Sequence, residues 1–283
     1  MLKLKATGRG RHYTKFRALY ESAEKLAYVG GWPARILDRV PAVHRVRTVR
    51  HELALRRGRG ELKVAFVSDL HIGPLTSMRL LEAAFAALAE MEPDVLLLGG
   101  DYVSYDATPA KAALITQLVA SVPAPTKLAV LGNHDLWADH GVIERALEAG
   151  GARVLINESV TLRGPHDDVV VVGVDEPWTG DPDPDRAFAG TTAPVKIVLT
   201  HAPEGYPFVA DRGAALMLCG HTHGGQIALP KGPVVVHGPL GRKYPCGLFE
   251  IGATRMYVSR GLGNSDVPLR MNAPPDVALF RIS

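Results

Sequence analysis

The chain has 283 residues, of which 47% are hydrophobic and 22% charged, a composition typical of a globular protein with a large core. Two cysteines are too few for a disulfide framework. No apolar run approaches the roughly 20 residues of a membrane-spanning helix, and the basic N-terminus lacks the apolar segment of a secretory signal. The expected location is cytoplasmic, with peripheral contact to the inner face of the membrane left open.

Positive charge is concentrated at the N-terminus. Residues 1–60 carry 15 Lys or Arg against four Asp or Glu, although the net charge of the whole chain is only +3. The remainder of the chain is correspondingly acidic. This asymmetry predicts a basic N-terminal arm over residues 1–60 that meets an anionic partner, and a main domain over residues 61–283.

Within the arm, residues 15–28 have the periodicity of an amphipathic helix. Apolar residues recur three and four positions apart with charged residues between them, and Gly30-Gly31-Trp32-Pro33 ends the pattern. Two interpretations stay open: the helix packs on the main domain, or residues 1–30 lie in the plane of a membrane with basic residues on anionic head groups. Nucleic acid is disfavoured because no aromatic and basic recognition motif accompanies the charge.

Strand and helix patterns alternate from Glu61 to Gly150. Strands are predicted at 62–68, 95–98 and 127–131, and helices after Thr76 or Ser77, near 109–120 and near 141–149. This order favours parallel pairing in an α/β layered fold. Beyond Gly150 the pattern is strand-rich, with strands predicted at 153–156, 159–162, 169–174, 195–200, 215–218, 247–251, 255–259 and 277–282. Two sheets face to face, with helices outside, accommodate both halves.

Polar residues cluster at the C-terminal ends of five predicted strands, where open α/β sheets place their ligand sites. The clusters are Ser68-Asp69-Leu70-His71, Gly99-Gly100-Asp101, Gly132-Asn133-His134-Asp135, Thr200-His201 and Cys219-Gly220-His221-Thr222-His223. Buried charged and imidazole groups cost desolvation energy unless something satisfies them, and a pair of divalent cations would do so. Carboxylate, imidazole and amide oxygen together suit Mn, Fe or Zn better than Ca. Because side chains two apart share a strand face, each Asp-x-His or His-x-His pair is expected to reach one site.

Together these clusters resemble the five-block signature of the calcineurin-like metallophosphoesterases, over roughly residues 62–283. The longer block Gly220-His-Thr-His-Gly-Gly-Gln-Ile resembles one branch of that family, bacterial and often membrane-associated phosphoesterases, some of which are UDP-2,3-diacylglucosamine pyrophosphatases. The resemblance implies a four-layer α-β-β-α sandwich with two mixed sheets. It also implies that one cation is held by Asp69, His71 and His223, a second by Asn133, His201 and His221, and that Asp101 bridges them.

The same resemblance places His134 near the substrate phosphate, with Asp135 orienting it. Two divalent ions about 3.5–4 Å apart acidify a shared water until hydroxide is available near neutral pH. His134 would then donate a proton to the leaving oxygen or stabilise equatorial charge, with Asp135 fixing its tautomer. We therefore expect a dinuclear-metal-dependent phosphoesterase that acts on a phosphodiester, phosphomonoester or pyrophosphate of a small-molecule, nucleotide-sugar or lipid-linked substrate.

A Gly/Pro-rich loop after the His-x-His block carries further candidates. Arg242, Lys243 and Tyr244 either contact a phosphate or sugar or belong to a solvated loop, and Arg260 and Arg270 are weaker candidates of the same kind. Two rival functions are considered. A non-catalytic protein-binding scaffold requires degraded metal ligands, and every ligand is present. A nuclease needs a basic groove, whereas the main domain is acidic, and a protein phosphatase usually has longer insertions between the blocks.

Overall fold

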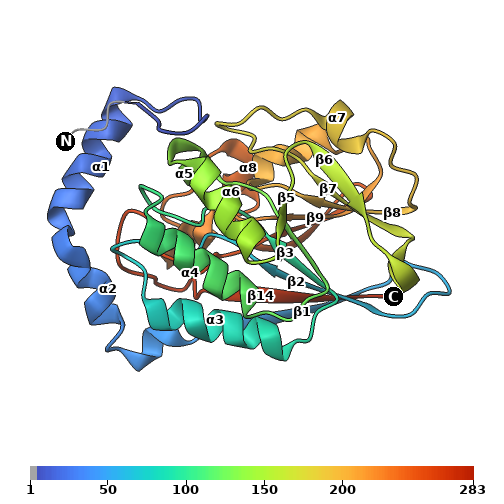
Figure 1. The fold of residues 1–283 in the computed structure, drawn as a ribbon, viewed down its shortest axis with the longest axis horizontal. Coiled ribbons are helices and arrows are strands. Elements are labelled where there is room, and N and C mark those ends of the chain that lie inside the picture. Colours follow the sequence, from blue (N-terminus) through green and yellow to red (C-terminus); the bar gives the residue numbers. More distant parts are fainter. Residues whose placement is uncertain (1–4) are drawn as a thin grey trace.

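The computed structural model describes residues 5–283, which form two six-stranded sheets that pack face to face between helices (Figure 1). The strand order is β1-β14-β2-β3-β4-β5 in the first sheet and β12-β13-β9-β8-β7-β6 in the second. Both sheets mix parallel and antiparallel pairs. The predicted α/β fold with two mixed sheets is therefore confirmed.

The first sheet contains the strand–helix alternation expected from the sequence. Its strands are Arg47–Leu53 (β1), Leu62–Val67 (β2), Val95–Leu98 (β3), Thr126–Ala129 (β4), Arg153–Val154 (β5) and Asp276–Ile282 (β14). Its outer face is covered by helices Met78–Glu90 (α3), Pro109–Ala120 (α4) and His140–Ala149 (α6). Ser77 caps α3 by accepting a hydrogen bond from the Leu80 amide, as expected for a serine at this position.

The second sheet is built from the strand-rich half of the chain. Its strands are Glu158–Thr161 (β6), Val169–Gly173 (β7), Val195–Leu199 (β8), Ala214–Cys219 (β9), Gly247–Ile251 (β12) and Thr254–Val258 (β13). Shorter elements complete the fold: helices Asn133–Trp137 (α5), Pro184–Phe188 (α7) and Pro239–Lys243 (α8), and the hairpin Ala228–Leu229 (β10) with Gly232–Pro233 (β11).

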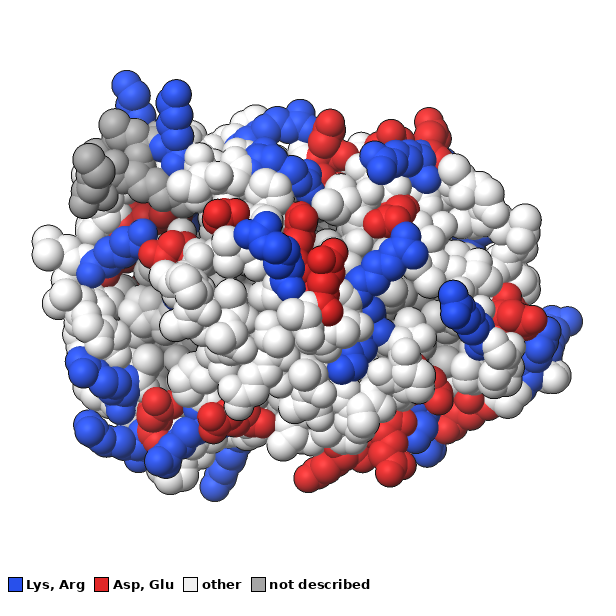
Figure 2. All heavy atoms as spheres, in the orientation of Figure 1, with Lys and Arg blue, Asp and Glu red and all other residues white. Residues whose placement is uncertain are grey.

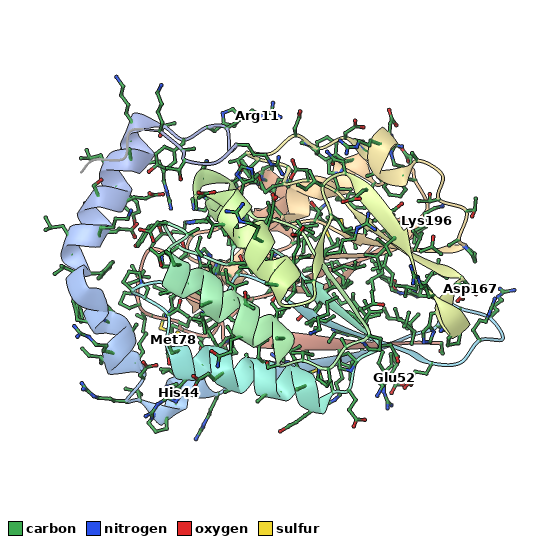
Figure 3. All side chains as sticks on the ribbon, viewed as in Figure 1. Arg11, His44, Glu52, Met78, Asp167 and Lys196 are labelled. Carbon is green, nitrogen blue, oxygen red and sulfur yellow. The ribbon has the colours of Figure 1, made fainter. Side chains whose placement is uncertain are left out.

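The core between the sheets explains why the central strands are uniformly apolar. Along β2, Val64 and Phe66 face the second sheet, whereas Ala65 and Val67 face the helices. Each strand is thus covered on both sides, so it reads as a continuous apolar run without alternation. The side chains that fill this space are drawn in Figure 3, with Glu52 and Lys196 at its periphery.

Strand β1 was not predicted. Its residues, 47–53, belong to the segment that the sequence analysis assigned to the N-terminal arm. This strand is the edge of the first sheet and runs parallel to β14. Arg50 and Glu52 interrupt its apolar pattern, while the Leu53 side chain reaches the core and the His51 ring stacks on Phe280. An edge strand that is only half buried has too few apolar positions to stand out in sequence.

The amphipathic helix forms as Lys15–Ala27 (α1), and a short helix Trp32–Leu37 (α2) follows the Gly30-Gly31 turn. Helix α1 is oriented differently from an ordinary surface helix, which buries its apolar face. The buried side chains of α1 are Ala18, Glu21 and Glu24, whereas Phe16, Leu19 and Leu26 are 78%, 62% and 78% exposed. The helix therefore turns its polar face toward the body of the protein and its apolar face outward. Among residues 5–283, no helix has the length and hydropathy to cross a bilayer.

Residues 7–11 fasten the start of the arm to the main body. The Arg9 guanidinium forms a two-pronged ion pair with the buried Asp175 carboxylate, at 2.5 and 2.7 Å. The amides of Thr7 and Gly10 donate to carbonyls of α5. Much of the arm's positive charge is thus neutralised by the chain's own acidic residues, and Figure 2 shows basic and acidic side chains interleaved over one face.

The buried carboxylate of Asp276 joins the two sheets. It stands at the start of β14 and accepts hydrogen bonds from the Tyr257 and Ser259 hydroxyls, at 3.1 and 2.6 Å. It also forms an ion pair with Arg260 at 3.0 Å. All three partners come from β13 or the residues that follow it, so one charged group links the first sheet to the second.

Replacing Asp276 with alanine should destabilise the fold by about 3 kcal/mol, because it leaves buried donors and a partly buried guanidinium without their acceptor. Urea unfolding measures the effect. As a control, Asp185→Ala removes an exposed ion pair with Arg212 and should change the midpoint little. Equal midpoints for the two variants would contradict the linking role of Asp276.

Candidate metal centre

The polar clusters meet at one end of the two sheets. Asp69 and His71 follow β2, Asp101 follows β3, and Asn133 begins α5 just beyond β4. From the second sheet, His201 follows β8, and His221 and His223 follow β9. Six of these seven side chains are buried and His221 is half-buried. The carboxyl ends of strands from both sheets therefore bring six of the seven predicted ligands together, and Asn133 lies in the same block as Gly132, whose backbone packs against the Asp101 carboxylate.

One group of donor atoms consists of Asp69, His71 and His223. The two Nε2 atoms of His71 and His223 are 3.0 Å apart, and Asp69 Oδ1 lies 3.4 Å from His223 Nε2. Ligands held at about 2.0–2.2 Å from one cation are separated by about 3.0–3.5 Å. Two of the three distances match this spacing, and Asp69 Oδ1 lies 4.0 Å from His71 Nε2, so the group could close around one ion with a small movement.

A second group consists of Asp101, His201 and His221. Asp101 Oδ2 lies 3.2 Å from His201 Nε2 and 3.5 Å from His71 Nε2, so this carboxylate stands between the two groups. Asn133 Oδ1 and His221 Nε2 are buried without a hydrogen-bond partner. Buried polar atoms are normally paired, so these two unpaired atoms are candidate ligands for a cation.

The protonation of the ring nitrogens suits this use. His201 Nδ1 donates to the Gly99 carbonyl at 2.8 Å, which leaves Nε2 as the ligand atom. Burial lowers the pKa of His71 and His221, the latter to about 3, and favours the neutral imidazole that metal ligation needs. His201 differs: burial opposes the charged ring, but the Asp101 carboxylate dominates and raises the pKa to about 10, so a cation that binds Nε2 must displace a proton.

Left-handed backbone, and not strand alternation, brings the paired ligands together. β2 and β9 end before their ligand pairs begin. Five of the seven ligands have positive φ angles between 43° and 69°, namely Asp69, His71, Asp101, His221 and His223. The expectation that Asp-x-His and His-x-His share one face of an extended strand was therefore wrong. Such backbone costs about 1–3 kcal/mol per residue and is typical of functional sites.

The glycines of the blocks make room for the carboxylates. A Cβ atom at Gly220 would collide with Asp69 Oδ2 and Ser68 Oγ, and one at Gly132 would collide with the Asp101 carboxylate. The Asp69 carboxylate also accepts from the His221 amide, at 3.1 Å from both oxygens. Glycine at these two positions thus reflects close packing of the backbone against a buried charged group.

Asp135 does not orient His134, contrary to expectation. Its carboxylate accepts from the amides of Asp101, Tyr102 and Gly132 at 2.8–2.9 Å, and so fixes the Asp101 loop. The His134 ring is oriented by the Ser104 carbonyl, which accepts from Nδ1 at 2.7 Å. His134, His71 and Asp101 form a third group of donor atoms that lie within 4.8 Å of one another, and Nε2 of His134 is the ring nitrogen left open by Ser104.

Of the remaining candidates, Arg242, Lys243 and Tyr244 lie in α8 and at its end. Arg242 and Lys243 are exposed, and the Tyr244 ring packs against Phe249, with ring centres 5.0 Å apart. No described contact joins these three residues to the metal ligands. Arg260 pairs with Asp276.

Several neighbours of the centre were not predicted. Trp178 and His237 have ring centres 6.0 and 6.5 Å from that of His221. Arg270, only a weak candidate for substrate binding, contacts His223 Nδ1 at 3.1 Å. Arg17 of α1 reaches His134. None of these residues belongs to one of the five polar clusters of the sequence, so their proximity to the centre is seen only in the folded chain.

Comparison with known proteins identifies the family to which the chain belongs. Residues 62–225 match the calcineurin-like phosphoesterase family. The chain is a calcineurin-like metallophosphoesterase. Over 242 residues it is 31% identical to phosphodiesterase YaeI of Escherichia coli K12, which covers 83% of this chain and 87% of that protein. Over 254 residues it is 30% identical to the uncharacterized metallophosphoesterase YkuE of Bacillus subtilis, covering 84% and 86%.

Solved structures show the same fold. The protein TT1561 of Thermus thermophilus is 16% identical, with a TM-score of 0.50 over 72% of this chain and 91% of that one. As a member of the family, the chain is a metal-dependent hydrolase of phosphoric esters, and the family carries divalent metals. The non-catalytic scaffold is thereby set aside.

Replacing Asp101 should weaken metal binding at both donor groups, because its carboxylate stands between them. Asp101→Ala is expected to retain less than about a tenth of the bound Mn, measured by mass spectrometry after loading and desalting. His221→Ala, which loses a donor of the second group alone, should retain about half. Retention of one full equivalent by Asp101→Ala would contradict the shared position.

Proposed function

We propose that the centre binds two divalent cations, drawn from Mn, Fe or Zn, and that the chain hydrolyses a phosphodiester. The observation that carries this proposal is the position of Asp101 between two sets of donors. The phosphodiesterase name of the 31% identical relative favours a diester over a monoester or pyrophosphate. In this assignment one cation is held by Asp69, His71 and His223, the other by Asn133, His201 and His221, and both by Asp101.

Cations at these positions supply Lewis acidity, which acidifies water and offsets the negative charge of the phosphate. The protein residues have separate tasks. Asp135 holds the Asp101 loop in place through three backbone amides. His134 is the side chain available to the substrate, because Ser104 occupies Nδ1 and leaves Nε2 open.

His134 either stabilises charge on the phosphoryl oxygens or passes a proton to the leaving oxygen. With Nδ1–H bonded to the Ser104 carbonyl, the neutral ring presents a lone pair at Nε2. A proton on Nε2 makes the ring a cation that donates toward an anionic substrate. Both roles place Nε2 against the phosphate and require the ring orientation that the Ser104 carbonyl sets.

His134→Ala should keep both cations and lower kcat by about 10²–10⁴-fold, the usual contribution of a positioned acid or base. The assay uses bis-p-nitrophenyl phosphate with the Mn-loaded protein, and metal content is measured on the same samples. His12→Ala, at an exposed position, serves as the control. If His134→Ala kept its turnover but lost metal, His134 would be a ligand and the assignment would be reversed.

The arm supports a second part of the proposal, contact with an anionic membrane. The apolar outer face of α1 continues past the turn through the exposed Val29, Trp32 and Ile36. Glu21 and Glu24, the acidic residues of α1, are buried, while Arg35 of α2 is exposed. An apolar face flanked by basic and not acidic side chains is typical of helices that lie in a membrane interface. The inner leaflet provides the anionic lipids, which makes a lipid-linked substrate accessible.

Leu19→Glu with Leu26→Glu should release the protein from vesicles that contain phosphatidylglycerol, because both exposed side chains would face the bilayer. Sedimentation with these vesicles, and with pure phosphatidylcholine as a comparison, measures the effect. Activity on soluble bis-p-nitrophenyl phosphate should stay within about twofold. Equal sedimentation of the double variant and the unmodified protein would end the membrane proposal without affecting the metal centre.

A further inference from the structure

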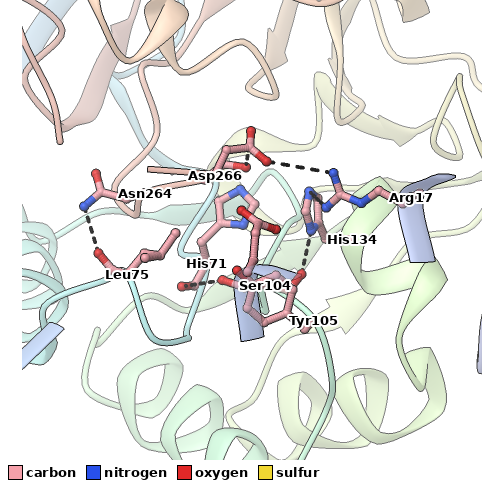
Figure 4. Close-up of a pocket in the computed structure, with 10 residues that line it drawn as sticks. Arg17, His71, Leu75, Ser104, Tyr105, His134, Asn264 and Asp266 are labelled. Atoms are coloured by element: carbon pink, nitrogen blue, oxygen red, sulfur yellow. Dashed lines mark hydrogen bonds and ion pairs between the residues drawn. The ribbon is translucent and has the colours of Figure 1, made fainter. Parts of the chain in front are cut away.

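The inward face of α1 places a positive charge beside the metal centre. Arg17 lines a hollow together with His71 and His134, although it lies 117 residues from His134 in the sequence (Figure 4). Its Nη2 atom is 3.5 Å from His134 Nε2. The guanidinium is held in place by Glu21, whose Oε1 accepts from Nε at 3.1 Å, and lies over the Trp137 ring at 5.1 Å.

Docking of the helix does not account for this arginine. Its close ion-pair partner, Glu21, belongs to the same helix, and the nearest carboxylate from the main body, Asp266, is 3.9 Å from Nη1. Other contacts hold the arm: the Arg9–Asp175 pair at its start, and a hydrogen bond of 3.2 Å from the Tyr28 hydroxyl to the Asp266 carbonyl at its end. The guanidinium therefore keeps two N–H-bearing nitrogens directed at the hollow.

The partner that Arg17 meets there is a weak one. Because Nδ1 of His134 donates to the Ser104 carbonyl, the neutral ring offers only a lone pair at Nε2, at a distance near the limit of a hydrogen bond. A phosphate oxygen makes shorter bonds of about 2.7–2.9 Å with a guanidinium, and the planar fork of arginine fits two such oxygens.

We propose that Arg17 binds the phosphoryl group of the substrate from the α1 side, next to His134. This inference rests on the proposed phosphoesterase function and adds a substrate-binding residue outside the family blocks. With the side chains in this arrangement the hollow has no room for a water molecule. The incoming anion therefore replaces the contact between Arg17 and His134, and the guanidinium moves from the ring to the phosphate.

The inference also constrains the substrate. Arg17 and Glu24 of α1 line the hollow together with Asn264, Ser265 and Asp266. We expect a phosphate that binds between these two segments to be a small or terminal group, and not part of duplex nucleic acid or of a folded phosphoprotein. This favours a small-molecule or lipid-linked ester over the substrates of a nuclease or a protein phosphatase.

The test measures binding of inorganic phosphate to the Mn-loaded full chain by isothermal titration calorimetry. Arg17→Met keeps the alkyl stem over Trp137 and removes the charge, so phosphate affinity should fall at least tenfold with metal content unchanged. Lys15→Met removes a positive charge from an exposed position on the same helix and should leave the affinity within twofold. Unchanged phosphate affinity in Arg17→Met would overturn the proposal.

A second variant separates phosphate binding from helix docking. Asp266→Asn removes the body's carboxylate partner of Arg17. If Arg17 binds phosphate, this variant should bind phosphate as tightly as the unmodified protein or more tightly, because the guanidinium loses a competing anion. If Arg17 only docks the helix, Asp266→Asn and Arg17→Met should weaken phosphate binding alike and expose α1 equally to limited proteolysis, which would overturn the proposal.

Steady-state kinetics with bis-p-nitrophenyl phosphate complete the test. Arg17→Met should raise KM at least tenfold, and Arg17→Lys should recover part of the loss because the charge returns without the planar fork. An unmodified protein that bound two cations and hydrolysed the ester, with a KM unaffected by Arg17→Met, would refute the role of Arg17 alone. An unmodified protein with neither metal nor hydrolysis would refute the proposed function itself.

Discussion

The buried carboxylate of Asp101 is the constraint around which the rest of this end of the molecule is arranged. An ionised carboxylate in a dry interior is costly unless several groups compensate its charge. Here His201 and His71 face one oxygen, and the His134 amide donates to the other at 2.9 Å. Although burial opposes ionisation, these imidazole neighbours hold the pKa of Asp101 well below its usual value. The two sheets can bring their ligands together because this charge sits between them.

That requirement explains why the neighbouring backbone is strained and why its neighbours are small. The loop that carries Asp101 has a left-handed residue at Asp101 itself and another at Gly100, and it is fixed by the Asp135 carboxylate. Gly132 leaves space for the Asp101 side chain. The left-handed backbone at Asp101, the glycine at position 132 and the Asp135 carboxylate thus act together. They allow a charged side chain to be held deep in the fold at the cost of local backbone strain.

The sequence predicted the fold class and the polar clusters of the centre because both depend on local patterns. Uniformly apolar runs marked the central strands, and the ligands follow those runs directly, so Asp69 and His201 could be placed from strand ends alone. What the sequence could not provide were contacts between distant segments. The Ser104 carbonyl that orients His134 is a backbone atom with no signature. Arg17 and Arg270 reach the centre from segments whose own patterns indicate only a helix and a loop.

The orientation of α1 shows the same limit from another side. Periodicity identifies two faces of a helix, but not which face meets the protein. In this chain the face with Glu21 and Glu24 is buried, because polar partners such as Arg17 lie over a charged centre and not over an apolar core. Which face of the helix is buried therefore depends on the polarity of the surface that the helix covers. That surface is formed by residues far from the helix in the sequence.

The position of β14 has a consequence for how the protein is made. Residues 276–282 lie between β1 and β2, so two strands from the first quarter of the chain become neighbours only through a strand that is synthesised after all the others. Until that strand is in place, β2 has an open edge and β1 has no partner in the first sheet. The sheet from which Asp69 and Asp101 extend is therefore complete only when residues 276–282 have been inserted between two strands that precede them by more than 200 residues.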